Sequence, residues 1–146
     1  MAKVKIKKLS EDAIIPKYAH KGDSGMDVFA IETMLIPPMR RALVKTGLSF
    51  EIPKGYEIQV RPKSGLALND GITCLNSPGT MDSNYRGELK VILINHSSKS
   101  YFVEKGTKVA QIVLGRVEEI KFKEVKKLNN TTRGEGGFGS TGKRPN

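Results

Sequence analysis

The chain has 146 residues, enough for one domain with a buried core, and its 25 Lys and Arg against 15 Asp and Glu give a net charge of +10, which favours anionic partners. The single cysteine, Cys74, excludes an internal disulfide and a cysteine-based metal cluster, and it suits a reducing compartment. Since the sequence has neither an apolar run of roughly 18 residues nor an apolar segment behind its N-terminal lysines, we expect a soluble, cytoplasmic protein with no membrane partner.

The first half of the chain alternates strand patterns with turns. Residues 3–7 alternate charged and apolar side chains, which is typical of a strand with one buried face. A further strand is predicted over 41–44. The patterns over 48–52 and 56–61 flank the turn-forming residues 53–55 and predict a hairpin.

Residues 19–30 form a predicted loop that runs into a strand and carries two aspartates, Asp23 and Asp27. Two closely spaced carboxylates could attract a hard cation directly or through its water molecules. Aspartates beside glycines are also ordinary turn residues, so the sequence leaves both interpretations open.

The one convincing helix pattern follows Pro62. Ser64 could cap a short helix that Gly71 ends. A helix N-terminus with a serine hydroxyl, free backbone N–H groups and the adjacent Lys63 would suit a phosphate group. A plain capped turn would explain the same residues.

Residues 76–95 combine a turn, an exposed segment and a strand. Turn-forming residues open the stretch at 76–79, and one carboxylate, Asp82, and one aromatic ring, Tyr85, follow. The strand predicted over 89–94 is apolar on both faces, which places it deep in a sheet. A carboxylate and a ring at the mouth of a rigid hairpin predict a small-molecule pocket, with a polar hairpin tip as the alternative.

The remaining strand patterns complete an all-β protein. Two strand patterns over 101–103 and 108–114 flank the turn at 104–107 and predict another hairpin. Gln111 in the second strand is either a hydrogen-bonded core residue or a pocket ligand. Residues 120–125 alternate and predict a further strand. Short strands separated by turns, with one short helix, predict a jelly-roll-like β-sandwich or barrel.

The C-terminal segment 133–142 is half glycine and cannot build a core of its own. We therefore divide the chain into a β domain over 1–128 and a flexible glycine-rich arm over 129–146. The arm is either a disordered terminus or a lid. As a lid, its backbone N–H groups and Arg133 would meet phosphates, and Phe138 would stack on a base.

Five segments together resemble the trimeric dUTPase family, the dUTP nucleotidohydrolases. They occur in the family's order and span nearly the whole chain, as A-H-K-G-D-S-G-M-D at 19–27, P-K-S-G-L-A at 62–67, G-T-M-D-S-N-Y-R-G at 79–87, G-T-K-V-A-Q-I at 106–112 and R-G-E-G-G-F-G-S-T-G at 133–142. The resemblance implies an enzyme that hydrolyses dUTP to dUMP and pyrophosphate with the help of Mg²⁺. It also implies a homotrimer with shared active sites, in which phosphate loops, hairpin and arm come from three different subunits.

The resemblance implies roles for the hairpin residues. Asp82 would be the general base that orients the water attacking the α-phosphorus. Tyr85 would pack under the deoxyribose and leave no room for a 2′-hydroxyl. The hairpin backbone, including Gly79 and Met81, would join Asn76 in reading the polar edge of uracil and would refuse a 5-methyl group.

The resemblance also implies contacts with the triphosphate and its metal. Ser64, Gly65 and Gln111 would contact phosphates or the catalytic water, and Asp27 would hold water bound to Mg²⁺. The family usually has arginine where this chain has Lys63. Lysine keeps the charge but loses the bidentate fork, so we expect looser phosphate geometry at that position.

In the arm, the resemblance implies that Arg133 meets the terminal phosphate, that Phe138 covers the uracil, and that Gly139 also contacts the substrate.

Two other functions would fit parts of this sequence. A dCTP deaminase shares this fold, but its essential glutamate would fall at Ile92, and an aliphatic side chain cannot move protons. A nucleic-acid-binding or regulatory protein would suit the net charge and the arm. Aromatic residues are sparse, however, and the lysines are dispersed, so we expect no stable nucleic-acid binding.

Overall fold

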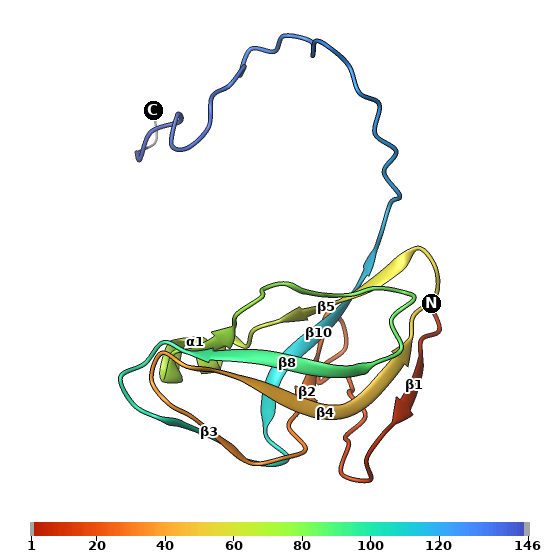
Figure 1. Cartoon of the computed structure of the whole chain (residues 1–146), viewed down its shortest axis with the longest axis vertical. Coiled ribbons are helices and arrows are strands. Elements are labelled where there is room, and N and C mark those ends of the chain that lie inside the picture. Colours follow the sequence, from red (N-terminus) through yellow and green to blue (C-terminus); the bar gives the residue numbers. More distant parts are fainter. Residues whose placement is uncertain (1, 145–146) are drawn as a thin grey trace.

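Two four-stranded antiparallel sheets pack against each other in the computed structural model, which describes residues 2–144 (Figure 1). The first sheet has the strand order β1-β4-β8-β6 and the second β2-β10-β5-β7, while β3 and β9 form a separate pair. The elements are β1 (Lys5–Lys8), β2 (Gly25–Phe29), β3 (Met34–Ile36), β4 (Arg41–Glu51), β5 (Tyr56–Arg61), α1 (Ser64–Asp70), β6 (Ile72–Cys74), β7 (Gly79–Met81), β8 (Glu88–Asn95), β9 (Tyr101–Val103) and β10 (Lys108–Arg116). The all-β, jelly-roll-like prediction is confirmed.

The hydrophobic core lies between the two sheets, because one face of each strand turns inward. Strand β8 shows this alternation. Leu89, Val91 and Leu93 are buried, whereas Ile92 and Ile94 are only half-buried on the opposite face. The strand lies between β4 and β6, as its apolar sequence predicted, but its outer apolar face remains partly accessible in this chain.

Strand β4 corrects two predictions. The hairpin predicted from 48–52 and 56–61 does not form, because β4 and β5 lie in different sheets, and the hairpin predicted from 101–103 and 108–114 fails for the same reason. The patterns over 41–44 and 48–52 were expected to form two strands, but they form one strand of 11 residues. Its pairing with β8 shifts in register between Lys45 and Ser49, and Gly47 within this shift has a φ of 68°. A bulge of this kind lets a strand bend without ending, so the break in the sequence pattern marks a bend and not a turn.

The bulge in β4 is joined to β8 and to the residues just before it by three hydrogen bonds that involve side chains. The buried Thr46 hydroxyl donates to the Leu89 carbonyl at 2.6 Å, and the Ser49 hydroxyl donates to the Arg86 carbonyl at 2.7 Å. The Gly47 N–H donates to the Glu88 carboxylate at 2.9 Å. These bonds replace ladder bonds that the register shift removes.

The predicted helix is confirmed as α1, which ends at Gly71 with a left-handed φ of 66°. Ser64 does not cap it. The N-cap residue is Lys63, no side chain caps the N-terminus, and Ser64 is the first helical residue. Within residues 2–144, no helix is long and apolar enough to cross a membrane.

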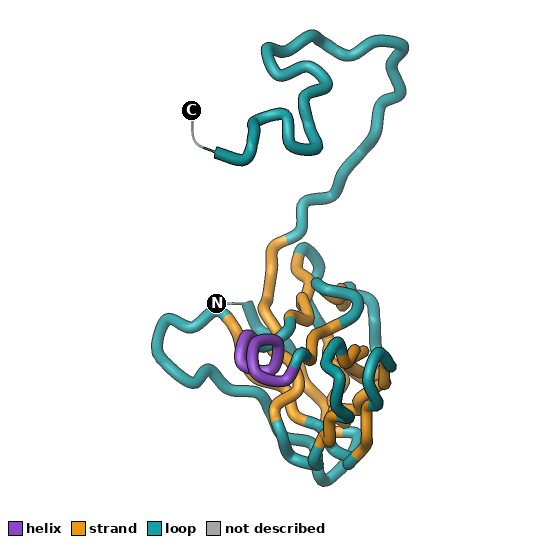
Figure 2. The backbone as a smooth tube through the Cα atoms, turned by 90° about the vertical axis from the view of Figure 1, so that its left-hand side faces the viewer, coloured by secondary structure: helices purple, strands orange, loops and turns teal. Residues whose placement is uncertain are grey.

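The strand predicted over 120–125 is absent, and residues 117–144 contain neither strand nor helix. This segment leaves the end of β10 and extends away from the two sheets (Figures 1 and 2). Ile120 and Phe122 are 75% and 88% exposed, because the segment has no neighbouring strand within residues 2–144 to pair with. The boundary after residue 128 stays a prediction, and residues 145–146 of the predicted arm lie outside the described residues.

The bulge predicts a specific sensitivity at Gly47. A Cβ there would lie 3.0 Å from the Ala13 Cβ and 3.2 Å from the Ser10 Cβ, in addition to the cost of the left-handed backbone. Gly47→Ala should therefore lower the free energy of unfolding in urea by about 2–4 kcal/mol. Gly55→Ala is the matched control, because Gly55 has a φ of 83° and open space around it, and it should cost about 1 kcal/mol. Equal losses for the two variants would contradict a packing role for the bulge.

Candidate functional site

The stretch 76–95, predicted as a hairpin, instead leads from β7 in one sheet to β8 in the other, so β7 and β8 do not pair with each other. The name hairpin is used for this stretch, and hydrogen bonds within it hold its tip between β7 and β8. The Tyr85 N–H donates to the Asp82 carbonyl at 3.1 Å, and the Tyr85 hydroxyl donates to the Glu88 carbonyl at 3.1 Å. The Arg86 guanidinium donates to the carbonyls of Ser83 and Tyr85 at 2.7 and 3.0 Å. The tip is therefore a fixed support for the side chains of Asp82 and Tyr85.

Gly87 gives the Tyr85 ring its place. A Cβ at position 87 would lie 2.3 Å from the Tyr85 hydroxyl oxygen and 2.4 Å from the ring carbon that carries it. Any side chain at position 87 would displace the ring, so glycine at this position permits the observed orientation of the Tyr85 ring.

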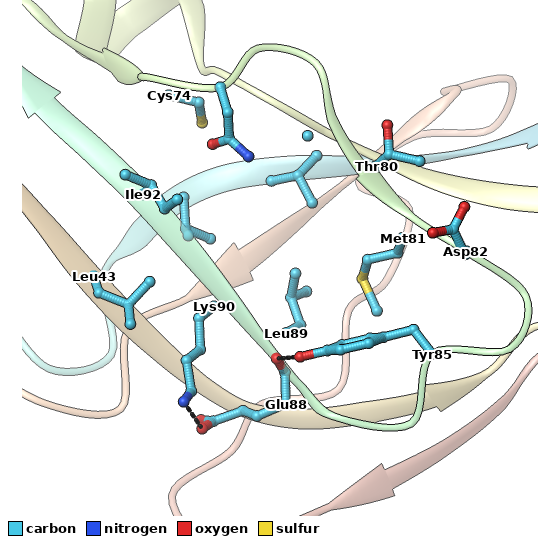
Figure 3. Close-up of a pocket in the computed structure, with 14 residues that line it drawn as sticks. Leu43, Cys74, Thr80, Met81, Asp82, Tyr85, Glu88, Leu89, Lys90 and Ile92 are labelled. Atoms are coloured by element: carbon cyan, nitrogen blue, oxygen red, sulfur yellow. Dashed lines mark hydrogen bonds and ion pairs between the residues drawn. The ribbon is translucent and has the colours of Figure 1, made fainter.

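A cavity of about 290 Å³ opens beside this hairpin (Figure 3). Its lining includes the predicted substrate residues of the hairpin, which are Asn76, Gly79, Met81, Asp82 and Tyr85. Asp82 lies at the rim, with the Tyr85 ring nearby and its hydroxyl directed at the Glu88 backbone. The volume is at the lower end of small-molecule sites, so the cavity would fit a base and sugar more readily than a whole nucleoside triphosphate.

Sequence reasoning missed several residues of this cavity. Leu43, Thr80, Lys90 and Ile92 also line it, and Lys90 lies 3.9 Å from the Glu88 carboxylate. Thr80 lies within the segment 79–87, but no motif marks the other three residues, although Lys90 and Ile92 share the outer face of β8 by their period of two.

Cys74 lines the same cavity but offers no nucleophile. Burial raises the pKa of its thiol to about 11, so the thiol stays protonated near neutral pH.

A second group of predicted residues gathers around Asp27 on β2. The Lys63 ammonium donates to one oxygen of the Asp27 carboxylate, and the Lys108 ammonium lies 2.8 Å from the other. Gln111 pairs with Asp27 across β2 and β10, and its amide donates to the Pro62 carbonyl at 3.0 Å. Asp27, Lys63 and Gln111 line a cavity of about 410 Å³ that shares no lining residue with the hairpin cavity.

The two lysines keep Asp27 ionised. Burial raises the pKa of the Asp27 carboxyl, but the hydrogen bonds and charges of Lys108 and Lys63 outweigh burial, so the pKa lies below its ordinary value. Sequence reasoning did not include Lys108, although it stands in the segment 106–112.

The Asp27 group fits a metal only as an outer contact. Residues 2–144 contain no group of three or more His, Cys, Asp and Glu side chains that could hold an ion. One carboxylate engaged by two ammonium groups suits a hydrogen bond to metal-bound water, the role that the family resemblance implies for Asp27, better than direct ligation.

Gly25 and the start of α1 complete this region. A Cβ at Gly25 would lie 2.3 Å from the Gln111 side-chain oxygen, so glycine makes room for that amide. Ser64 and Gly65 are exposed in the first turn of α1, directly after Lys63.

The predicted contacts of the arm lie apart from both cavities. Phe138 is fully exposed, and the Arg133 guanidinium donates to the Gly136 carbonyl at 2.8 Å. Arg133, Phe138 and Gly139 belong to the segment that extends away from the sheets (Figure 2). Within a single chain, the predicted site residues therefore fall into three places.

Comparison with known proteins identifies the family to which the chain is similar. The dUTPase family model matches residues 11–142. A deoxyuridine 5'-triphosphate nucleotidohydrolase of Clostridioides difficile is 54% identical over 142 residues, covering 97% of this chain and 99% of the relative.

Two solved structures share the fold over most of the chain. The dUTPase of Staphylococcus bacteriophage 80alpha with dUpNHpp superimposes with a TM-score of 0.87 and 28% identity, covering 96% of this chain and 98% of the phage chain. A mutant dUTPase from phage phi11 of S. aureus, described for its coordination of a structural Mg(II) ion, has a TM-score of 0.77 and 25% identity, covering 86% of this chain and 97% of that one.

The family match spans all five segments that the sequence singled out, and the relatives agree with this chain over nearly their full length. The chain belongs to the dUTPase family.

Proposed function

We propose that this chain hydrolyses dUTP to dUMP and pyrophosphate, with Asp82 orienting the water that attacks the α-phosphorus. The observation that carries the proposal is the hairpin cavity, where a carboxylate, an aromatic ring and an amide surround a space suited to a base and sugar. Phosphoryl transfer needs positioning and charge neutralisation more than covalent help, and a carboxylate on a rigid tip supplies the positioning.

Recognition of deoxyuridine follows from the same hairpin. Tyr85 would lie under the deoxyribose, where its ring leaves no room for a 2′-hydroxyl. Asn76 and the backbone of β7 at Gly79 and Met81 would bond the polar edge of uracil. Space beside Gly79 is tight, since a Cβ there would lie 3.2 Å from Val60, so a close-fitting wall would exclude a 5-methyl group.

The Asp27 group would receive the phosphates. Lys63, Ser64, Gly65 and Gln111 would contact phosphate oxygens or the attacking water. Mg²⁺ bound to the triphosphate would neutralise part of its charge, and Asp27 would hold a water of that ion.

We further propose a homotrimer in which hairpin, phosphate loops and arm come from different subunits, with the arm over 129–146 acting as a lid. The three separate places of the predicted residues support this arrangement. Apolar surface left uncovered by the chain also supports it, with Leu43 50% exposed on the outer face of β4 and Phe122 88% exposed on the extended segment. Arg133, Phe138 and Gly139 would then close over a substrate held by neighbours.

The test of activity is pyrophosphate release from dUTP, UTP, dTTP and dCTP, with and without Mg²⁺. The amide of Asp82→Asn keeps the shape but cannot accept a proton, so kcat should fall by roughly 10²–10⁴ with little change in substrate affinity. Asp12→Asn is a control, because Asp12 is an exposed partner of Lys105 and should leave kcat unchanged. A tenth of the wild-type kcat in Asp82→Asn would mean that another group directs the water.

Tyr85 should determine sugar selectivity. The wild-type protein should prefer dUTP to UTP and to dTTP by at least about a hundredfold in kcat/KM, roughly 3 kcal/mol. Tyr85→Ala should reduce the dUTP to UTP ratio by about tenfold or more, because it opens space at the sugar, and should leave the dUTP to dTTP ratio unchanged. Equal loss of both ratios would show that the ring does not act at the sugar.

Sharing of the site between subunits predicts complementation. Asp82→Asn with an intact arm and a chain ending before Arg133 should each be nearly inactive alone. After joint unfolding and reassembly in equal amounts, about three-quarters of trimers are mixed, and each mixed trimer regains one working site of three, which gives about a quarter of wild-type activity. No recovery, with mixed trimers confirmed by mass, would place the whole site in one subunit.

A further inference from the structure

Asp27 has two cationic partners, and they differ in position. Lys63 precedes α1, where it faces the cavity proposed for phosphates, and its side chain is 25% exposed. Lys108 is the first residue of β10, and its side chain is 54% exposed. It lines a different cavity, which Asp27 also lines. The carboxylate between them is 19% exposed and engages one ammonium with each oxygen.

This arrangement sets a cost for using Lys63. An ammonium held by a carboxylate must leave it, at least in part, to bond a phosphate. If Lys63 were the only partner, its departure would leave a mostly buried carboxylate unpaired, which is costly, and would direct that charge at an incoming anion. Lys108 remains on the second oxygen and avoids both penalties.

We propose that Lys108 is a positioning residue for the phosphates of a nucleoside triphosphate: it stays on Asp27 while Lys63 turns to the substrate. The inference rests on the proposed function. Lys108 acts through Asp27, because it neutralises the Asp27 carboxylate. Without Lys108, the carboxylate would compete with the substrate for Lys63 and would repel the phosphates. The flexible stem and compact charge of lysine at position 63 suit this exchange, whereas the rigid fork of arginine suits simultaneous bidentate contacts.

The experiment is a double-mutant cycle read by binding in the absence of divalent metal. Calorimetry measures the affinity of dUpNHpp, of pyrophosphate and of deoxyuridine for the wild type, Lys108→Gln, Asp27→Asn and the double variant. Lys108→Gln should weaken dUpNHpp and pyrophosphate by roughly tenfold when Asp27 is present, and by less than about twofold in the Asp27→Asn background, because the charge to be neutralised is then absent. Deoxyuridine carries no phosphate, so its affinity should not change.

Two control variants accompany the cycle. Lys105→Gln removes one lysine charge from the turn that precedes β10, where Lys105 pairs with Asp12 at 2.7 Å, and it should leave dUpNHpp affinity unchanged. Lys108→Arg keeps a cation beside Asp27 and should retain wild-type affinity.

Each adverse outcome has a distinct meaning. The same loss from Lys108→Gln in both backgrounds would show direct phosphate contact by Lys108 and overturn the inference, as would no loss at all or a parallel loss of deoxyuridine binding. Any of these leaves the proposed function standing. Failure of the wild type to bind dUpNHpp both without divalent metal and with Mg²⁺ added would instead overturn the proposed function, and the inference with it.

Discussion

The hydrogen bonding of β8 between β4 and β6 holds the functional hairpin in place. Where the β4–β8 ladder shifts register, Thr46 and Ser49 bond to backbone carbonyls of the hairpin side, and the Glu88 carboxylate accepts the Gly47 N–H. A buried donor that lost its acceptor would cost about 1–3 kcal/mol, so each of these bonds opposes displacement of the tip. The position of Asp82 is thus determined by strand pairing several residues away from it.

Part of the positive charge of this chain, which totals +10, gathers around Asp27. The ammonium groups of Lys63 and Lys108 both contact the Asp27 carboxylate. The carboxylate fixes their positions but neutralises only one of the two positive charges. Such a group attracts a polyphosphate better than it attracts a free cation. The structure also opposes the deaminase alternative, because Ile92 lines the hairpin cavity and offers no group that could transfer a proton.

A single chain leaves its apolar surface and its predicted site incomplete. The hairpin cavity and the Asp27 cavity share no lining residue, and residues 129–144 of the arm line neither of them. The outer face of β8 and the segment after β10 both carry accessible apolar side chains. The proposed homotrimer would explain these features, because neighbouring subunits would cover the apolar surface and bring the separate groups together.

The sequence by itself determined what depends on local pattern: most of the strands, the short helix with its glycine end, and the placing of Asp82 and Tyr85 on one exposed segment that leads into β8. These features follow from alternation and turn chemistry within a few residues, so neighbouring side chains are sufficient to predict them. The five segments also carried the family resemblance and, with it, the candidate residues.

Only the tertiary structure decided what depends on partners distant in the chain. It joined two predicted strands into β4 through a bulge whose bonds come from β8, and it brought Lys108 to Asp27. It also left residues 120–125 unpaired, because an alternating pattern makes a strand possible while a neighbouring strand must supply its hydrogen bonds.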